Sequence, residues 1–329
     1  MEKKGVKLAY TGRYPQRRGF LLVLLQCSQH RVAHVDSGHT DTGFEVAKAN
    51  GSRIPKPPRA LYTLLEGRAL FEMALLPALY PLLRNTPNGD GHPVLLVPGF
   101  TASDATLVGL AAFLRSRGYH VETWGLGQNT GFKLKFSQAL EQKLRFMHHR
   151  HQRKVSMVGW SLGGVYTFYA AHSAPECVRS VVSLGSPMKF STDELIEVPV
   201  IVKAAYRYFA HPMGPVAHLA NVRAKVLREP PPVPSTCVFS MTDGIVPPDA
   251  ARIEDTDDDK HENIWVPGSH VGLGFNAAVM WILADRLAQA EGEWRPFDPT
   301  GVAGNAYRRI AKWLGPAEQG QRRGVAVPG

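Results

Sequence analysis

One short stretch of the chain has the residue types of a covalent catalyst. Ser161 stands at the centre of the sequence GWSLG, residues 159–163, and a further glycine, Gly164, follows it. A serine hydroxyl becomes an effective nucleophile only when a base removes its proton and a third group orients that base. The motif predicts a nucleophile elbow at Ser161. The alternative is a glycine turn in which the serine only caps the next helix.

The elements that this motif needs are predicted on both sides of it. Residues 155–158 are an apolar run short enough for a buried parallel strand, and the apolar spacing of a helix begins at Leu162. In so tight a turn the glycines remove Cβ atoms that would clash. The serine hydroxyl would project above the edge of the sheet, near the positive end of the helix.

Two residues later in the chain have the types and positions of the partners of Ser161. The elbow motif predicts the order serine, acid, histidine. Asp243 follows a predicted strand in a turn opened by Gly244, and His270 lies between the last strand and the last helix. Sites in open α/β sheets lie at the carboxyl ends of the strands. We therefore expect His270 to act as the base and Asp243 to orient it.

The oxyanion formed by attack on a carbonyl needs donors that are already in place. One is expected to be the backbone N–H of Leu162, directly after the nucleophile. The other is expected from the loop after the strand 94–97, where Gly99 allows close approach and Phe100 offers its N–H.

Other acids and histidines are less suitable than Asp243 and His270 as partners of Ser161, because of their positions in the chain. We interpret the acidic loop as a solvated surface; its members are Asp249, Asp255, Asp257, Asp258, Asp259 and Glu262. It is not expected to bind calcium, because Lys260 and Val266 occupy the positions that need glycine and glutamate. Clustered His148, His149 and His151 suit a helix C-terminus, and His218 and His261 lack a strand-end context. No metal and no cofactor is predicted.

Alternating strands and long helices predict the fold class: an α/β chain with a doubly wound, mostly parallel sheet. The predicted strands are 94–97, 119–124, 155–158, 178–184, 236–241 and 263–266, and the predicted helices are 105–116, 135–149, 162–172 and 272–289. Residues 186–234 interrupt this alternation and are predicted to form a helical lid over an apolar pocket, which Trp160, Tyr206 and Phe209 would line. The alternative is a helical excursion unrelated to substrate.

The rest of the chain divides into three parts around a catalytic domain at 86–290. Residues 1–58 are expected to be a basic, poorly ordered extension; the alternative, a secretion or lipoprotein signal, has only the short apolar run 20–25 in its favour. Residues 59–85 have helical spacing that Pro77 and Pro81 should break or kink. That helix is expected to pack on the core, with peripheral membrane contact as the alternative. Residues 291–329 form a polar tail with an amphipathic stretch at 307–314.

The composition limits the classes of partner. The 329 residues carry a net charge of +10, but the basic residues are scattered and no nucleic-acid-binding motif is present. Nucleic acid is therefore not an expected partner, and no run of about 20 apolar residues predicts a membrane span. The three cysteines do not form a disulfide framework, which is compatible with a cytoplasmic location; a secreted protein or a lipoprotein is the alternative.

The combined motifs resemble those of the bacterial α/β-hydrolase esterases and lipases over roughly residues 86–290. They are the run from Gly89 to Phe100, the GWSLGG elbow, the sequence LGSP at 184–187, the turn DGIVP at 243–247 and the sequence GSH at 268–270. The resemblance implies the α/β-hydrolase fold, ester substrates and no cofactor. Many true lipases have His-Gly where this chain has Pro98-Gly99, which counts against long-chain lipase activity.

These patterns together predict a serine carboxylester hydrolase that works through an acyl-enzyme and acts on a small or lipid-like ester. Lactone opening, amide hydrolysis or acyl transfer on the same three residues are alternatives, because the fold does not determine the substrate. A non-catalytic binding protein of the same fold is a further alternative, against which the complete Ser161, Asp243 and His270 set argues.

Overall fold

The computed structural model describes residues 60–188, 230–253, 260–298 and 325–326. The extension 1–58 and the amphipathic stretch 307–314 lie outside the described residues. So does most of the expected lid, with Tyr206 and Phe209.

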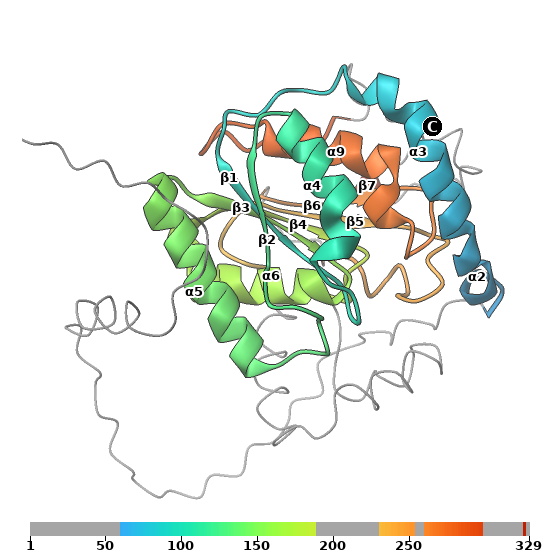
Figure 1. Cartoon of the computed structure of the whole chain (residues 1–329), viewed down its shortest axis with the longest axis horizontal. Coiled ribbons are helices and arrows are strands. Elements are labelled where there is room, and N and C mark those ends of the chain that lie inside the picture. Colours follow the sequence, from blue (N-terminus) through green and yellow to red (C-terminus); the bar gives the residue numbers. More distant parts are fainter. Residues whose placement is uncertain (1–59, 189–229, 254–259, 299–324, 327–329) are drawn as a thin grey trace, which may run out of the picture. The chain divides into compact units, whose positions relative to one another are not determined.

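A parallel sheet carries the fold, in the strand order β2-β1-β3-β4-β5-β6-β7 (Figure 1). Its strands are β1 (Pro93–Val97), β2 (His120–Thr123), β3 (Val155–Trp160), β4 (Val178–Leu184), β5 (Ser235–Phe239), β6 (His261–Trp265) and β7 (Val325–Ala326). Each neighbouring pair is parallel. The chain leaves β1 for β2 on one side and then returns to β3 on the other, so the sheet is doubly wound, as predicted, with its switch point between β1 and β3.

Helices cover both faces of this sheet, and a separate apolar core lies under each layer. Successive residues of a strand point to opposite faces. Leu96 of β1 therefore packs with α4 (Val108–Ser116) and α9 (Ala277–Leu287). Leu95 packs with α5 (Leu134–His151) and α6 (Leu162–Ser173). Burial on both faces explains why β1 is a continuous apolar run and why β3 is apolar apart from Ser156.

The helical segment before the sheet consists of α2 (Ala60–Leu64), the 3₁₀ turn η1 (Leu65–Arg68) and α3 (Ala69–Leu83). A break or a kink was predicted at Pro77 and Pro81; α3 runs through both prolines, so the predicted break is wrong. Each proline removes one backbone donor. Both are exposed, so water is available to the carbonyl oxygens that lose a helical partner. The change in helical geometry falls instead at η1, which contains Gly67.

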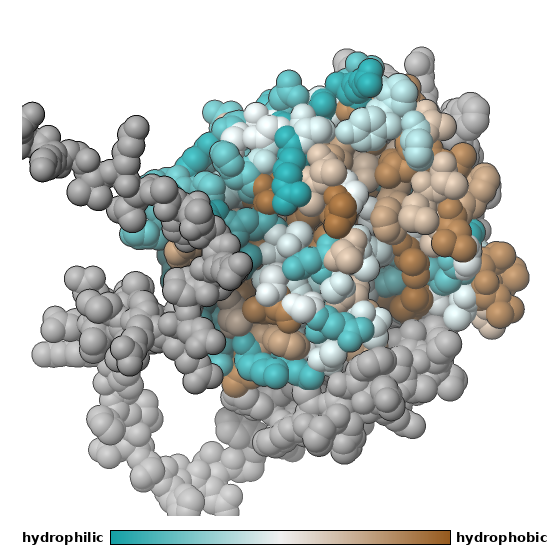
Figure 2. All heavy atoms as spheres, viewed as in Figure 1, coloured by the Kyte–Doolittle hydropathy of each residue, from teal (hydrophilic) through white to brown (hydrophobic). Residues whose placement is uncertain are grey.

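The outer surface of this segment is apolar (Figure 2). Leu64 is 82% exposed, Leu70 70% and Phe71 66%. No helix in the described parts of the chain is long and apolar enough to cross a membrane. Contact with a membrane surface stays a prediction.

Two of the predicted helices are shorter and begin with a separate turn. The helix predicted at 105–116 is the 3₁₀ turn η2 (Asp104–Leu107) followed by α4, and the helix predicted at 272–289 is η5 (Leu273–Phe275) followed by α9. Asn276 separates the latter two, because its side-chain oxygen accepts hydrogen bonds from the first backbone N–H groups of α9. A further 3₁₀ turn, η3 (Pro175–Cys177), leads into β4.

Candidate active site

The turn between β3 and α6 has the geometry of a nucleophile elbow. Ser161 has φ 54° and ψ −123°, a strained backbone conformation that residues other than glycine rarely adopt. A Cβ atom at Gly163 would lie 2.2 Å from the carbonyl oxygen of Val97, and one at Gly159 would lie 2.4 Å from the backbone nitrogen of Gly164. The close approach of α6 to β1 and β3 therefore requires the glycines of the motif.

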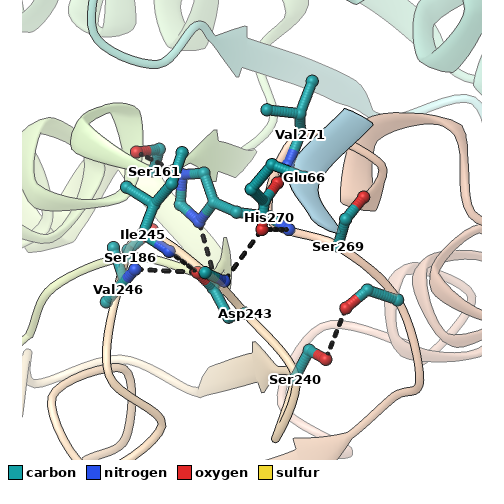
Figure 3. A network of polar contacts seen from close by, with 12 residues as sticks. Glu66, Ser161, Ser186, Ser240, Asp243, Ile245, Val246, Ser269, His270 and Val271 are labelled. Atoms are coloured by element: carbon teal, nitrogen blue, oxygen red, sulfur yellow. Dashed lines mark hydrogen bonds and ion pairs between the residues drawn. The ribbon is translucent and has the colours of Figure 1, made fainter. Parts of the chain in front are cut away.

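His270 lies between Ser161 and Asp243 (Figure 3). Its Nε2 atom is 3.0 Å from Ser161 Oγ, and its Nδ1 atom is 2.7 Å from Asp243 Oδ2. The structure thus brings the three residues predicted from the sequence into one hydrogen-bonded series, here called the first series.

Backbone hydrogen bonds occupy one carboxylate oxygen of Asp243, and the other oxygen faces the imidazole of His270. The residue is 1% exposed. Its Oδ1 atom accepts hydrogen bonds from the backbone N–H groups of Ile245 at 2.8 Å and Val246 at 2.7 Å, within the turn that Gly244 opens. Oδ2 faces His270, and these bonds hold the carboxylate in one orientation.

The charge balance around His270 makes it a stronger base than an ordinary imidazole. Burial opposes protonation, but the negative charge and the hydrogen bond of Asp243, together with the charge of Glu66, outweigh it and raise the pKa of His270. The raised pKa favours acceptance of the Ser161 proton.

The loop after β1 lies directly beside the serine. A Cβ atom at Gly99 would lie 3.1 Å from Ser161 Cβ, so only glycine leaves normal contact distances here. The loop is held by Asn129, whose side-chain amide donates to the carbonyl of Pro98 at 2.8 Å and whose backbone carbonyl accepts from Thr101 N–H at 2.7 Å. Phe100, the expected oxyanion donor, lies between these two fixed points.

Asn129 had no recognisable signal in the sequence. It stands among glycines in a stretch without helical or strand periodicity. The other expected donor, Leu162, is the first residue of α6.

Trp160, expected to line the pocket, is only 7% exposed. Its Nε1–H donates to the carbonyl of His270 at 3.2 Å, and its ring meets Phe275 edge to face with centroids 6.1 Å apart. These contacts place its side chain against the loop that carries His270, here called the histidine loop (residues 266–272).

Sequence reasoning missed three charged residues at the site. In the sequence, Glu66, Arg68 and Glu72 are only charged residues within the predicted N-terminal helix, and their residue types alone do not show that they reach the site. In the structure all three contact the histidine loop or the loop that carries Asp243, here called the acid loop (residues 240–246). The available signal was that charged residues spaced by two and four positions interrupt an otherwise apolar run.

The competing groups have other partners. Asp249 is exposed and paired with Arg252. The assignment of Glu262 to a solvated surface is wrong: it lies in β6 and its side chain is only 10% exposed. It accepts hydrogen bonds from Thr236 Oγ1 at 2.9 Å and Arg286 Nη1 at 3.0 Å. Asp255 and the acids at 257–259 lie outside the described residues. In the described ranges, no three His, Cys, Asp or Glu side chains are grouped to hold a metal ion.

The two cysteines in the described chain are free and buried. Burial raises the pKa of the Cys237 thiol to about 12, so this thiol stays protonated at neutral pH. The pKa of Cys177 is also raised by burial. Neither has the thiolate character of a nucleophile.

A second series of serine, histidine and aspartate starts from the other end of β3. His92 lies with Nε2 2.9 Å from Ser156 Oγ and Nδ1 2.6 Å from Asp90 Oδ1. Ser156 and His92 are fully buried. The order of hydrogen bonds is the same as in the series of Ser161.

Comparison with known proteins supports the fold but not a closer relationship. No family model and no curated protein matches the sequence. Among solved structures, lipase B from Aspergillus fumigatus has a TM-score of 0.51 and 18% identity, over 70% of this chain and 58% of that one. A monoacylglycerol lipase from Paleococcus ferrophilus is also similar (TM-score 0.44, 15% identity, 61% of this chain and 96% of that one).

A third solved structure is MGS-MChE2, an α/β hydrolase from the metagenome of lagoon sediments at Mar Chica, Morocco (TM-score 0.42, 20% identity, 60% of this chain and 93% of that one). The likeness to lipase B agrees with the parallel doubly wound sheet. The described chain has the α/β-hydrolase fold.

Proposed function

We propose that the protein is a serine hydrolase that cleaves carboxylic esters through an acyl-enzyme. The observation that carries the proposal is the position of His270, with one ring nitrogen on Ser161 Oγ and the other on Asp243 Oδ2. Esters are the proposed substrate class because the sequence motifs resemble those of esterases.

The first half of the reaction transfers the acyl group to the enzyme. Ser161 Oγ attacks the ester carbonyl while its proton passes to Nε2 of His270. Asp243 keeps the other ring nitrogen protonated and stabilises the imidazolium. The N–H groups of Phe100 and Leu162 hold the oxyanion. The tetrahedral intermediate then expels the alcohol, which takes the proton from His270.

The second half restores the serine. His270 takes a proton from water, which attacks the acyl carbonyl, and Ser161 leaves with the proton that His270 returns. The products are one carboxylic acid and one alcohol. Every step uses groups of the protein.

The test is turnover of a p-nitrophenyl ester series of increasing acyl length, together with labelling by a fluorophosphonate. Wild type should hydrolyse at least the short esters and gain one covalent adduct. S161A should lose both, with kcat falling by about 10³-fold or more. S116A is the control, because Ser116 is exposed at the end of α4. Full labelling of S161A would place the nucleophile elsewhere.

A further inference from the structure

The charged residues of the N-terminal segment face the active site, whereas its outer surface is apolar. Glu72 is buried, and Glu66 and Arg68 are half-buried. Burying charged groups is costly unless they are fully hydrogen-bonded. Their partners therefore show what the segment is built to hold.

Glu66 bridges the two catalytic loops. Its Oε1 atom accepts hydrogen bonds from the backbone N–H of Gly244, directly after Asp243, at 2.8 Å and from that of His270 itself at 3.0 Å. Its Oε2 atom accepts from Val271 N–H at 3.0 Å. Figure 3 shows Glu66 beside the backbone of His270. The carboxylate of Glu66 thus joins Gly244, the residue after Asp243, to His270.

Arg68 and Glu72 extend the same bridge. Nη2 of Arg68 donates to the carbonyls of Thr242 at 2.8 Å and Gly268 at 2.9 Å, one in each loop. Glu72 accepts from the backbone N–H and from the hydroxyl of Ser269, both at 2.9 Å, and pairs with Arg68 at 3.3 Å.

Both loops leave room for this contact. A Cβ atom at Gly244 would lie 2.4 Å from the backbone oxygen of Tyr62, and one at Gly272 would lie 1.5 Å from Glu72 Oε2. A side chain at either position would force the N-terminal segment away. The glycines and the charged residues belong to one interface.

We infer that Glu66 is a positioning residue for the proposed hydrolysis: it fixes the acid loop against the histidine loop and places a negative charge beside the His270 imidazole. The inference rests on the proposed function. Hydrogen bonds from backbone N–H groups to a carboxylate are stronger than those to a neutral acceptor and hold the donor in place. Catalytic rates respond to small displacements of a base from its nucleophile.

The charged groups around His270 make the role of Glu66 measurable. Asp243 faces the ring from the acid loop, and Glu66 faces it from η1. Arg68 and Glu72 bind its loop neighbours, Gly268 and Ser269. Burial lowers the pKa of His270, whereas Asp243 and, after it, Glu66 raise the pKa, with a net increase. Removing the charge of Glu66 should therefore lower the pKa of His270.

The test compares E66Q with T63V. Thr63 donates its hydroxyl to the carbonyl of Gly244 at 2.7 Å, so T63V disturbs the same loop without removing a charge. The pKa of His270 is measured by NMR of histidine-labelled full-length protein, with H270Q to assign the signal. Kinetics with a p-nitrophenyl ester are followed against pH.

For E66Q we expect the pKa of His270 to fall below that of wild type, because the negative charge of Glu66 no longer favours the imidazolium. The acid limb of kcat/KM should move to lower pH by the same amount, and kcat should fall about 10-fold with little change in KM. T63V should leave the pKa unchanged. E66D keeps the negative charge, so the pKa of His270 should stay close to that of wild type. E66D also serves as the test if E66Q does not fold. Its shorter side chain distorts the bridge, so kcat should fall while the pKa of His270 does not.

An unchanged pKa and an unchanged kcat in E66Q would overturn the inference, as would equal pKa shifts in E66Q and T63V. If E66Q does not fold, wild-type kcat in E66D would overturn it. Failure of the proposed function gives a different result: wild type would not turn over esters, while the NMR shift in E66Q would still report the charge beside His270.

Discussion

Strand β3 carries a serine near each end, and each serine belongs to a hydrogen-bonded series with a histidine and an aspartate. In the first series, Ser161 follows the last residue of the strand in a strained turn and is half-buried. In the second, Ser156 lies within the strand, is fully buried, and also contacts Ser180 Oγ at 3.1 Å. Only the first serine has the backbone conformation that exposes its hydroxyl to a substrate.

The two aspartates differ more than the two serines. Asp243 accepts hydrogen bonds from neutral backbone N–H groups, so its full charge acts on His270. Asp90 also pairs with Arg153 at 2.5 Å and with Arg179 at 2.9 Å. Burial of Asp90 opposes its ionisation, but the hydrogen bonds of Arg179 and His92 outweigh it and lower its pKa.

The histidines respond in opposite directions. Burial lowers the pKa of His92 to about 4, and the charge of Arg179 limits what Asp90 can restore, so this imidazole is neutral at pH 7. The pKa of His270 is raised. The same order of hydrogen bonds therefore holds an imidazole with a lowered pKa in one place and one with a raised pKa in the other. The two aspartates differ in the charge that they present to the histidine: Asp90 is paired with two arginines, whereas Asp243 accepts from backbone N–H groups and His270.

The largest effect should separate the two aspartates. D243N should lower kcat by about 10³- to 10⁴-fold, because an amide stabilises the wrong tautomer of His270. D90N should keep kcat within about 2-fold and lower the melting temperature, because buried Arg179 loses a partner. Both are measured by ester hydrolysis and calorimetry. A loss of kcat in D90N comparable to that in D243N would make the comparison wrong.

The next effect concerns stability against pH. Between pH 6.5 and about 4 the unfolded state binds a proton at His92 more readily than the native state, so wild-type stability falls as the pH decreases. H92Q removes this term, and its loss of unfolding free energy between pH 8 and pH 5 should be about 2 kcal/mol smaller than that of wild type.

His270 should show the reverse sign. Its contribution is fully present below its unfolded pKa and is lost as the pH rises through the higher folded value. H270Q should therefore lose stability relative to wild type mainly at pH 5. Urea unfolding of both variants at the two pH values is the measurement. Shifts of the same sign would contradict the opposite assignments of the two histidines.

The smallest effect is expected at the buried serine. S156A removes the contacts with His92 and Ser180 and should cost about 1 kcal/mol in unfolding free energy. Ester hydrolysis and fluorophosphonate labelling should match wild type. S180A is the matched control, since it breaks only the contact between the two serines. An adduct mapped to Ser156 would show that this hydroxyl is reactive.

The parts of this structure that follow from local patterns could be predicted from the sequence. A strand, a glycine turn and a helix around Ser161 are determined by neighbouring residues, and the alternation of elements determines a parallel sheet. Asp243 and His270 could be chosen because strand ends in such a sheet meet at one edge. The confirmed fold class rests on these regularities.

The remaining features depend on partners far along the chain. From the local sequence, Glu66 would be assigned to the surface, because its hydrogen bond from Gly244 N–H lies far along the chain. Glu262 would likewise be assigned to solvent, because its partner Arg286 is also distant in sequence. The series at His92 was missed because Ser156, 64 positions away, is an unremarkable residue of a buried strand. A break or a kink was expected at Pro77 and Pro81 because the sequence does not reveal that both prolines lie on the exposed side of α3.

The bridge at Glu66 also bears on how the protein folds. It joins residues 178 to 205 positions apart in the chain. Strands β1, β3 and β4 pair over much shorter separations, and the entropy cost of closing a loop rises with the length of the loop. A refolding chain should therefore complete its central sheet while the acid and histidine loops are still unsupported. Catalytic competence would then be acquired last, when the first helices of the chain dock onto the last loops.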